Sequence, residues 1–247
     1  MRAVTVCVDY ARILQRTIPL NLHHFEAWVI VTSPDDTETK RLIHAQNLGG
    51  NTKVQLVETD VFYRGGAEFN KGAAIEVGLD AAGREGWILC VDADIILPSR
   101  MDLGSISPGN LYGARRRLME ESASIPKESL WYHFPSVERE HRPGYEIPGF
   151  FHLFHGSDAV FNGRPWYPTH WRHAGGYDTE FQSRWKSANR IWLPFYVLHV
   201  GDLGKNWCGV KEGSEARLRE LMKIRSLTGR FDAEWVSGGS PDFLKRM

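Results

Sequence analysis

Short apolar blocks alternate with helical patterns over the first hundred residues of this 247-residue chain, and the alternation sharply restricts the possible folds. The blocks have the length and β-branched content of buried strands, and they cover residues 4–8, 28–31, 54–57 and 87–91. Between the first two blocks, apolar side chains recur with helical spacing at Leu14, Ile18, Leu22 and Phe25. Strands separated by helices predict an α/β fold with a doubly wound, mostly parallel sheet.

Two polar segments carry the signals of a helix N-terminus. Asp35 and Glu38 have the spacing of a capping box, so we expect a helix to begin there. Asn70 is expected to cap another helix, which ends near Gly83. Both helices lie between predicted strands, as the crossover connections of a parallel sheet require.

The composition changes after Pro98. Seven of the nine tryptophans lie beyond residue 130, six of the ten histidines fall between His133 and His173, and Gly and Pro become frequent. This composition predicts an aromatic, loop-rich region suited to a binding surface.

Regular structure is predicted to return later in the chain. A helix with one aromatic face is expected first, followed by a strand over residues 195–200 and a helix over about 214–226. The aromatic face of the first of these helices comprises Phe181, Trp185, Ala188 and Trp192.

The charge of the chain disfavours some classes of partner. Thirty basic and thirty acidic residues cancel. Nucleic acids and anionic membranes are bound by clustered Lys and Arg, so neither is an expected partner. The basic cluster at residues 115–117 is interpreted as a solvated turn, and an anion or phosphate site is the alternative.

The N-terminal segment and the cysteines favour a cytoplasmic protein. MRAVTVCVDYAR lacks the regions of a signal peptide, and no apolar stretch reaches the length of a membrane span. Cys7, Cys90 and Cys208 are odd in number and widely spaced, which argues against a disulfide framework or a thiolate zinc site. We expect them to be small buried apolar side chains.

Two carboxylates, Asp92 and Asp94, follow the last apolar block in the sequence GWILCVDADIILP. Burying an unpaired carboxylate is costly, so we expect both at the end of the strand and not inside it. In open α/β sheets the carboxyl ends of the strands border the ligand crevice, and this placement therefore predicts a binding site. A turn before Pro98 that uses the two carboxylates as caps is the alternative.

Several pieces of sequence occur in a characteristic order. Asp9 follows the first block, Asp35 and Asp36 follow the second, FNKGAA opens a helix, and VDAD ends the fourth block. Together with the later segment HAGGYDTEF, they resemble the GT-A fold glycosyltransferases, most closely family 2.

This resemblance covers residues 3–100 and, less fully, residues 173–200. It implies a single domain of the GT-A type, in which residues 1–100 are the nucleotide-sugar-binding half. Residues 101–247 are then the acceptor-binding half, which is elaborated with loops and aromatic residues.

The resemblance also implies roles at a donor site. Asp94 would bind Mn²⁺ or Mg²⁺, and Asp92 would contact the ribose or a metal-bound water. The other implied donor-binding residues are Asp9, Asp36, Asn70, Lys71 and Gly72. As alternatives, Asp36 suits a helix N-terminus, where the dipole favours a carboxylate, and Lys71 suits an exposed first helical turn.

A late histidine is a further metal ligand in many members of the family. By the resemblance, FYVLHVGD places His199 at the metal, near the end of a strand, and a buried core histidine is the alternative. His152 and His155 face opposite sides of an extended strand and cannot chelate one ion together. Zinc is therefore not expected.

The general base is where the chain departs from the family. Inverting members have an acidic pair soon after the Gly-Gly-aromatic-Asp turn, whereas residues 186–189 here read KSAN. The candidates for a base elsewhere are Asp178, Glu180 and Asp158. A retaining mechanism and a degenerate site are the alternatives, and Asp178 also suits a helix N-cap.

These observations predict a metal-dependent glycosyltransferase that moves a sugar from a nucleotide diphosphate sugar, in the first place a UDP-sugar, to an unidentified acceptor. Aromatic faces suit sugar rings, although the same residues suit a core. A non-catalytic nucleotide-sugar or glycan binder is the alternative, favoured by the missing acidic pair. A nucleotidyltransferase is disfavoured because VCVDYARILQR lacks a glycine-rich loop, and a nucleic acid acceptor is disfavoured by the neutral charge.

Overall fold

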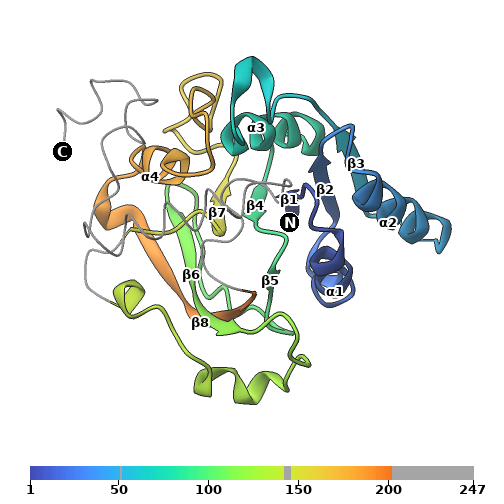
Figure 1. The fold of residues 1–247 in the computed structure, drawn as a ribbon. Helices are drawn as coiled ribbons and strands as arrows, with labels where there is room; N and C mark the ends of the chain where they lie inside the picture. Colours follow the sequence, from blue (N-terminus) through green and yellow to red (C-terminus); the bar gives the residue numbers. More distant parts are fainter. Residues whose placement is uncertain (51, 142–145, 202–247) are drawn as a thin grey trace, which may run out of the picture.

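The computed structural model describes residues 1–50, 52–141 and 146–201, so the helix predicted at 214–226 lies outside the described residues. Within the described part, eight strands form one sheet in the order β3-β2-β1-β4-β7-β6-β8-β5 (Figure 1). The strands are β1 (Arg2–Val6), β2 (Ala27–Thr32), β3 (Val54–Glu58), β4 (Trp87–Val91), β5 (Ile95–Ile96), β6 (Leu111–Met119), β7 (Phe151–His155) and β8 (Arg190–Val200).

The sheet is parallel in its first half and mixed in its second. β1 pairs in parallel with β2 and β4, and β2 pairs in parallel with β3. β7 runs antiparallel to both β4 and β6, and β6 is parallel to β8. The carboxyl ends of β4 and β6 therefore lie at the same edge of the sheet. The short β5, which follows β4 in the chain, pairs antiparallel with β8.

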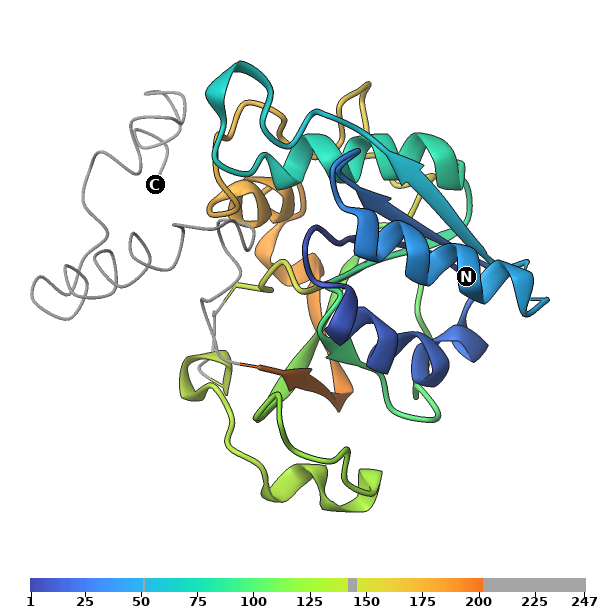
Figure 2. The same ribbon diagram turned by 45° about the vertical axis from the view of Figure 1, so that its right-hand side comes forward.

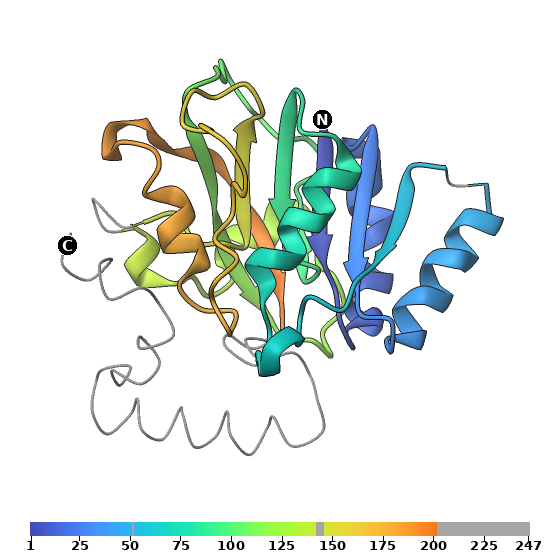
Figure 3. The ribbon, with the colours of Figure 1, turned by 90° about the horizontal axis from the view of Figure 1, so that it is seen from above.

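Helices cover both faces of the sheet. They are α1 (Ala11–Asn21), α2 (Thr37–Leu48), α3 (Lys71–Ala82) and α4 (Tyr177–Gln182), with 3₁₀ turns at Leu22–His24, Arg64–Gly66, Glu128–His133, Glu138–His141 and Ser187–Asn189. α1 and α2 lie side by side on one face, and α3 and α4 pack on the other (Figures 2 and 3). No helix in the described part of the chain is long and apolar enough to cross a membrane.

Alternation along the strands explains the two layers of helices. In β1, Ala3 contacts the core beneath α1 and α2, whereas the next residue, Val4, contacts the core beneath α3. A Cβ atom at Gly78 of α3 would lie 2.4 Å from Cγ1 of Val4, so glycine allows this helix to lie close to the sheet. The predicted α/β, doubly wound sheet is confirmed.

The aromatic helix predicted through Trp192 is wrong. α4 ends at Gln182, and Trp192 lies in β8. Pro194 is incompatible with a helix interior, and the aromatic and β-branched residues around it favour a strand. Pairing with β6 along most of its length holds this segment in the sheet.

Other local expectations are also corrected. Residues 115–117 lie in β6 and not in a solvated turn. The N-cap of α2 is Asp36 and not Asp35, because the Asp36 carboxylate accepts a hydrogen bond from the Thr39 N–H at 3.0 Å. The first strand is Arg2–Val6 and not residues 4–8, and α1 ends at Asn21, before a 3₁₀ turn.

The cysteines of the described residues belong to the core, as expected. Cys7 and Cys90 are buried free thiols. Burial raises the pKa of each thiol to about 12, so neither is a thiolate at neutral pH. Cys208 lies outside the described residues.

Candidate functional site

The sequence-predicted carboxylates gather at one edge of the sheet. Asp9 follows β1, Asp36 follows β2, and Asp92 and Asp94 follow β4, which are three neighbouring parallel strands. The carboxyl ends of parallel strands meet at the same edge, and ligands of open α/β sheets bind there.

Asp92 is paired with Lys71, the first residue of α3. The Lys71 Nζ donates to Asp92 Oδ1 at 2.6 Å and lies 5.3 Å from the centre of the Tyr177 ring. Burial opposes the charge of Lys71, but Asp92 and Tyr177 raise the pKa of its ammonium above the ordinary value. Lys71 is therefore cationic at neutral pH and is not the exposed lysine of the alternative interpretation.

Asp94 is paired with His199. Residue Ile95 of β5 lies opposite His199 of β8, which brings His199 Nε2 to 3.2 Å from Asp94 Oδ2. Burial alone would raise the pKa of Asp94, yet the His199 ring holds it below the ordinary value. Both side chains are only 8% exposed, so this pair is largely screened from water.

Arg116 lies behind this pair, and the sequence did not identify it as a site residue. Its Nη1 lies 3.3 Å from His199 Nδ1, its Nε lies 2.8 Å from Glu140 Oε1, and its guanidinium stacks 4.5 Å from the centre of the Phe150 ring. Because an arginine can only donate, His199 Nδ1 accepts this bond and Nε2 carries the hydrogen toward Asp94. The arginine cluster at 115–117 was the available signal.

Asp36 acts as an internal support. Besides capping α2, its carboxylate accepts hydrogen bonds from the Asp9 N–H at 2.9 Å and from the Thr32 hydroxyl at 2.8 Å. Asp9 has a φ of 55°, a left-handed conformation that is uncommon outside glycine. Asp36 therefore fixes an unusual turn that leaves the Asp9 side chain exposed at the edge.

Tyr63 is a further residue of this edge that the sequence did not identify. It is half-buried, and burial together with the charges of Asp9 and Asp36 raises the pKa of its hydroxyl. It neighbours a stacked aromatic pair, Phe62 and Phe69. An aromatic ring beside Asp9 is a suitable surface for a nucleobase.

Asn70 and Gly72 connect α3 to the loop after residue 162. Asn70 caps the helix, as predicted, by accepting from the Ala73 N–H at 3.0 Å, and it donates to the Thr169 carbonyl at 2.7 Å. A Cβ at Gly72 would lie 2.0 Å from the Pro168 carbonyl oxygen, so only glycine permits this approach. Both residues bring the loop against the start of α3.

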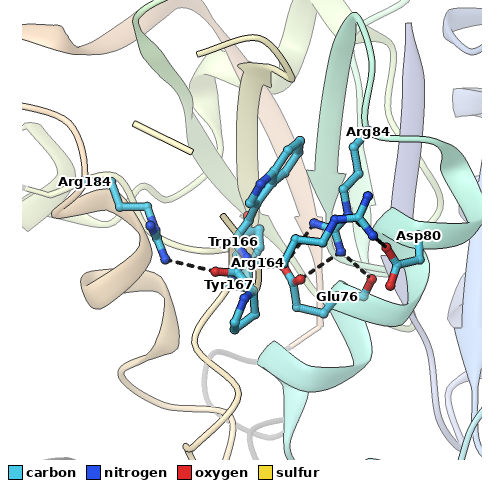
Figure 4. A network of polar contacts seen from close by, with 8 residues as sticks. Glu76, Asp80, Arg84, Arg164, Trp166, Tyr167 and Arg184 are labelled. Carbon is cyan, nitrogen blue, oxygen red and sulfur yellow. Dashed lines mark hydrogen bonds and ion pairs between the residues drawn. The ribbon is translucent and has the colours of Figure 1, made fainter. Parts of the chain in front are cut away.

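A buried ion-pair network anchors the same loop to the middle of α3 (Figure 4). Glu76 accepts hydrogen bonds from the Trp166 and Tyr167 N–H groups at 2.9 and 2.7 Å. Its second oxygen binds Arg84 at 2.8 Å, and Arg84 also binds Asp80 at 3.0 Å. Glu76 thus supplies the acceptor that the buried N–H groups of Trp166 and Tyr167 require.

The aromatic residues of this region are mostly core. Stacked and edge-to-face rings link Tyr167, Phe181 and Trp185 beneath α4, where none of the three is more than 1% exposed. These three aromatic residues therefore form part of the hydrophobic core and are not a surface for a sugar ring.

The three candidate bases are placed differently. Asp178 accepts from the Gly149 N–H at 3.0 Å, beside Phe150, whose carbonyl accepts from the Asp92 N–H at 3.1 Å. The N-cap of α4 is Gly176, so Asp178 does not have that role. Asp178 therefore lies next to the carboxylate edge.

Glu180 and Asp158 are held elsewhere. Glu180 Oε2 accepts from Trp171 Nε1 at 2.9 Å and lies 3.1 Å from His170 Nε2. Asp158 is buried and accepts from the Gly109 N–H at 2.6 Å. Asp158 follows β7, which runs antiparallel to β4, and therefore lies toward the edge opposite Asp92.

The donor atoms suit a divalent cation, although no group of three or more His, Cys, Asp or Glu within the described residues is arranged as a complete metal site. Asp94 Oδ2 and His199 Nε2 are 3.2 Å apart, and two atoms that bind one divalent ion at right angles lie about 3 Å apart. Mg²⁺ is typically bound by one or two carboxylates together with substrate phosphates, so a complete protein cage is not required.

No protein-family model and no curated protein matches the chain. Among similar solved structures, galactosyltransferase LgtC in complex with donor and acceptor sugar analogs has 9% identity and a TM-score of 0.45, covering 96% of this chain and 100% of that one. Glucosyl-3-phosphoglycerate synthase from Mycobacterium tuberculosis has 14% identity and a TM-score of 0.47, covering 94% and 81%. An inositol-1-phosphate CTP transferase from T. maritima has 11% identity and a TM-score of 0.40, covering 91% and 96%.

These TM-scores are all below 0.5, so the functional argument rests on the residues of the site. The strand order itself, with the Asp-x-Asp segment directly after β4, confirms the GT-A-like fold predicted from the sequence.

Proposed function

We propose that this protein is a divalent-metal-dependent glycosyltransferase that moves a sugar from a nucleotide diphosphate sugar, in the first place a UDP-sugar, to a hydroxyl acceptor. One observation carries the proposal. At the edge after β4, two carboxylates are each paired with a side chain that suits a diphosphate or its metal: Asp92 with Lys71 at 2.6 Å, and Asp94 with His199 at 3.2 Å.

In this proposal Asp94 and His199 hold Mn²⁺ or Mg²⁺. The cation would stabilise the negative charge that develops on the departing diphosphate. The Nε2 hydrogen of His199 must leave for that nitrogen to bind a metal, and Nδ1 must then carry a hydrogen in the place where Arg116 now donates. Metal binding at Nε2 would therefore require the hydrogen bond between Arg116 Nη1 and His199 Nδ1 to break.

Lys71 would contribute a second positive charge to the donor. Its ammonium lies at the start of α3, where helix N–H groups also favour anions. Asp92 orients this ammonium through their ion pair. If Lys71 instead binds a phosphate of the donor, the Asp92 carboxylate would be free to contact the ribose or a metal-bound water. Asp9 and Tyr63 would contact the nucleoside, with Asp36, Asn70 and Gly72 as supports.

Asp178 is our choice among the three candidate bases. It is the one beside the Gly149–Phe150 segment, whose backbone contacts Asp92. General base catalysis is worth about 10²–10⁴ in rate, so Asp178→Asn is expected to lower turnover by at least about 100-fold with donor affinity unchanged. Glu180→Gln, in the same first turn of α4, is the matched control and should retain turnover.

A non-catalytic nucleotide-sugar binder is the second candidate. It is favoured by residues 186–189, KSAN, which carry no carboxylate where inverting members of the resembled family have an acidic pair. Such a binder would recognise the donor and yet never cleave it.

The experiment measures thermal shift with UDP, GDP, ADP and CMP in the presence of Mn²⁺, and then hydrolysis of a panel of nucleotide sugars. The proposal predicts the largest shift with UDP and slow metal-dependent release of UDP from one UDP-sugar. Binding without hydrolysis or transfer would favour the binder. A larger shift with GDP would contradict the uridine preference, and no shift with any nucleotide would contradict the whole proposal.

A further inference from the structure

The second half of the sheet carries a pair of arginines that the proposed chemistry does not use. Arg115 and Arg117 are two residues apart in β6, so they project from the same face, opposite to the face of Arg116. Each guanidinium stacks on an aromatic ring of β8: Arg115 lies 5.1 Å from the centre of Trp192, and Arg117 lies 4.2 Å from the centre of Tyr196.

Stacking holds these cations in place without neutralising them. Within the described residues, the Arg115 side chain has no ion pair and no hydrogen bond, and the Arg117 side chain donates to the Phe134 carbonyl at 3.1 Å. The Nε atoms of both arginines are buried and lack hydrogen-bond partners in the described part of the chain. The nearby carboxylate of Glu140 is already engaged by Arg116.

A third basic side chain faces the same pair. The exposed ring of His141 lies 6.2 Å from the Tyr196 ring, and burial together with the charges of Arg115 and Arg117 lowers the pKa of His141. The ring is therefore a neutral hydrogen-bonding group at pH 7, next to two fixed cations.

The strand register places this cluster beside the candidate site. Tyr112 of β6 pairs with Leu153 of β7, which pairs with Leu89 of β4. Arg115 is three residues beyond Tyr112, as Asp92 is three residues beyond Leu89, and the two strands end at the same edge. Two strand spacings separate them, which is about 10 Å. Trp192 also packs on the face that α3 and α4 cover, the face of Lys71 and Tyr177.

We infer that Arg115 and Arg117 bind an anionic group, a phosphate or a carboxylate, on the acceptor of the proposed transfer. Planar guanidinium groups with unused N–H donors match the oxygens of such a group, and a distance of about 10 Å suits a small acceptor that reaches the sugar with its hydroxyl. Two cations suit a single anionic group more than a phosphate backbone, which is bound by many. That the bound anion is the acceptor of a sugar rests on the proposed function. That the two arginines bind an anion does not depend on it.

The test measures binding of glycerol 3-phosphate, glycerate and neutral glycerol by calorimetry, with and without saturating UDP and Mn²⁺. We expect one or both anions to bind and glycerol not to bind, and the two anions separate a phosphate site from a carboxylate site. The double variant Arg115→Gln/Arg117→Gln should weaken anion binding by about tenfold or more, because each charged hydrogen bond contributes strongly. The control Arg64→Gln, at an exposed ion pair with Asp60, should bind as wild type.

Three outcomes would overturn the inference: no anion binds more tightly than glycerol, the folded double variant binds anions as wild type, or UDP with Mn²⁺ displaces the anion, which would assign the arginines to the donor site. Arg115→Lys/Arg117→Lys retains the charges and tests the fork geometry if the Gln variant is unstable. If UDP fails to bind while the anion binds through the arginines, the proposed function fails and the anion site remains.

Discussion

The two halves of the sheet edge carry opposite charges, and different forces hold them in place. After β1, β2 and β4 the functional side chains are carboxylates in loops, held by helix caps and by single partners such as Lys71 and His199. In β6 they are arginines within a strand, held by two rings of β8 and by the ring of Phe150, which directly precedes β7. In the first arrangement the side chains follow the ends of strands, whereas in the second they belong to a strand and depend on its neighbours in the sheet.

The largest expected effect comes from breaking the buried ion pair of Arg116 and Glu140, in which Glu140 is fully buried. Arg116→Met leaves a buried carboxylate without its main cation, which costs about 3–5 kcal/mol of unfolding free energy. Urea denaturation measures the loss. Arg64→Met, which breaks an exposed pair, should cost about 0–1 kcal/mol. A loss below about 1 kcal/mol for Arg116→Met would show that this arginine is not a structural support of the second half.

The aromatic core of the second half predicts a pH dependence. His152 hydrogen-bonds to the Tyr167 hydroxyl at 3.0 Å, and burial lowers the pKa of its ring to about 4. Between the ordinary pKa of about 6.5 and that value, the unfolded chain binds more protons than the folded one, so stability falls as the pH falls.

The loss attributable to His152 is about 3 kcal/mol between pH 6.5 and pH 4. Denaturation at several pH values, in wild type and in His152→Gln, checks this expectation by difference. Equal pH profiles for the two proteins would mean that the ring is not held neutral in the core.

The ion pair between His199 and Asp94 joins the two halves of the sheet, because His199 belongs to β8 and Asp94 follows β4. Substitution of His199 therefore tests this contact. His199→Ala is expected to weaken Mn²⁺-dependent UDP binding by about 10–100-fold while cooperative unfolding persists. A core histidine would behave in the opposite way, with lower stability and an unchanged metal affinity. Calorimetry and thermal unfolding of the same samples distinguish the two.

The smallest expected effect concerns Lys71, the partner of Asp92 on the carboxylate side. Lys71→Met removes one cation from the proposed donor site, and we expect UDP affinity to fall by about tenfold. Lys127→Met, on the exposed segment before the third 3₁₀ turn, is the control. If both variants bind UDP as wild type, Lys71 serves only to neutralise Asp92.

Local signals explain which features were predictable. The buried block at 87–91, the carboxylates after it and the Asn70 cap follow from neighbours in sequence, and the structure has all three. Arg116 was not predictable, because a run of three arginines is typical of a solvated turn and only pairing with β7 and β8 makes it a strand. The helix predicted through Trp192 failed for the same reason, since its aromatic spacing fits a strand as well once β6 is beside it.

The proposed metal site at Asp94 is tested most directly by calorimetry of UDP binding, with and without Mn²⁺, to the wild type and to Asp94→Asn. This substitution preserves the shape of a side chain that is only 8% exposed and removes its charge. We predict that Mn²⁺ tightens UDP binding to the wild type by at least about 100-fold and that Asp94→Asn, still cooperatively folded, loses this effect. UDP binding that is equal with and without Mn²⁺ in the wild type, or a full Mn²⁺ effect in the variant, would contradict the claim.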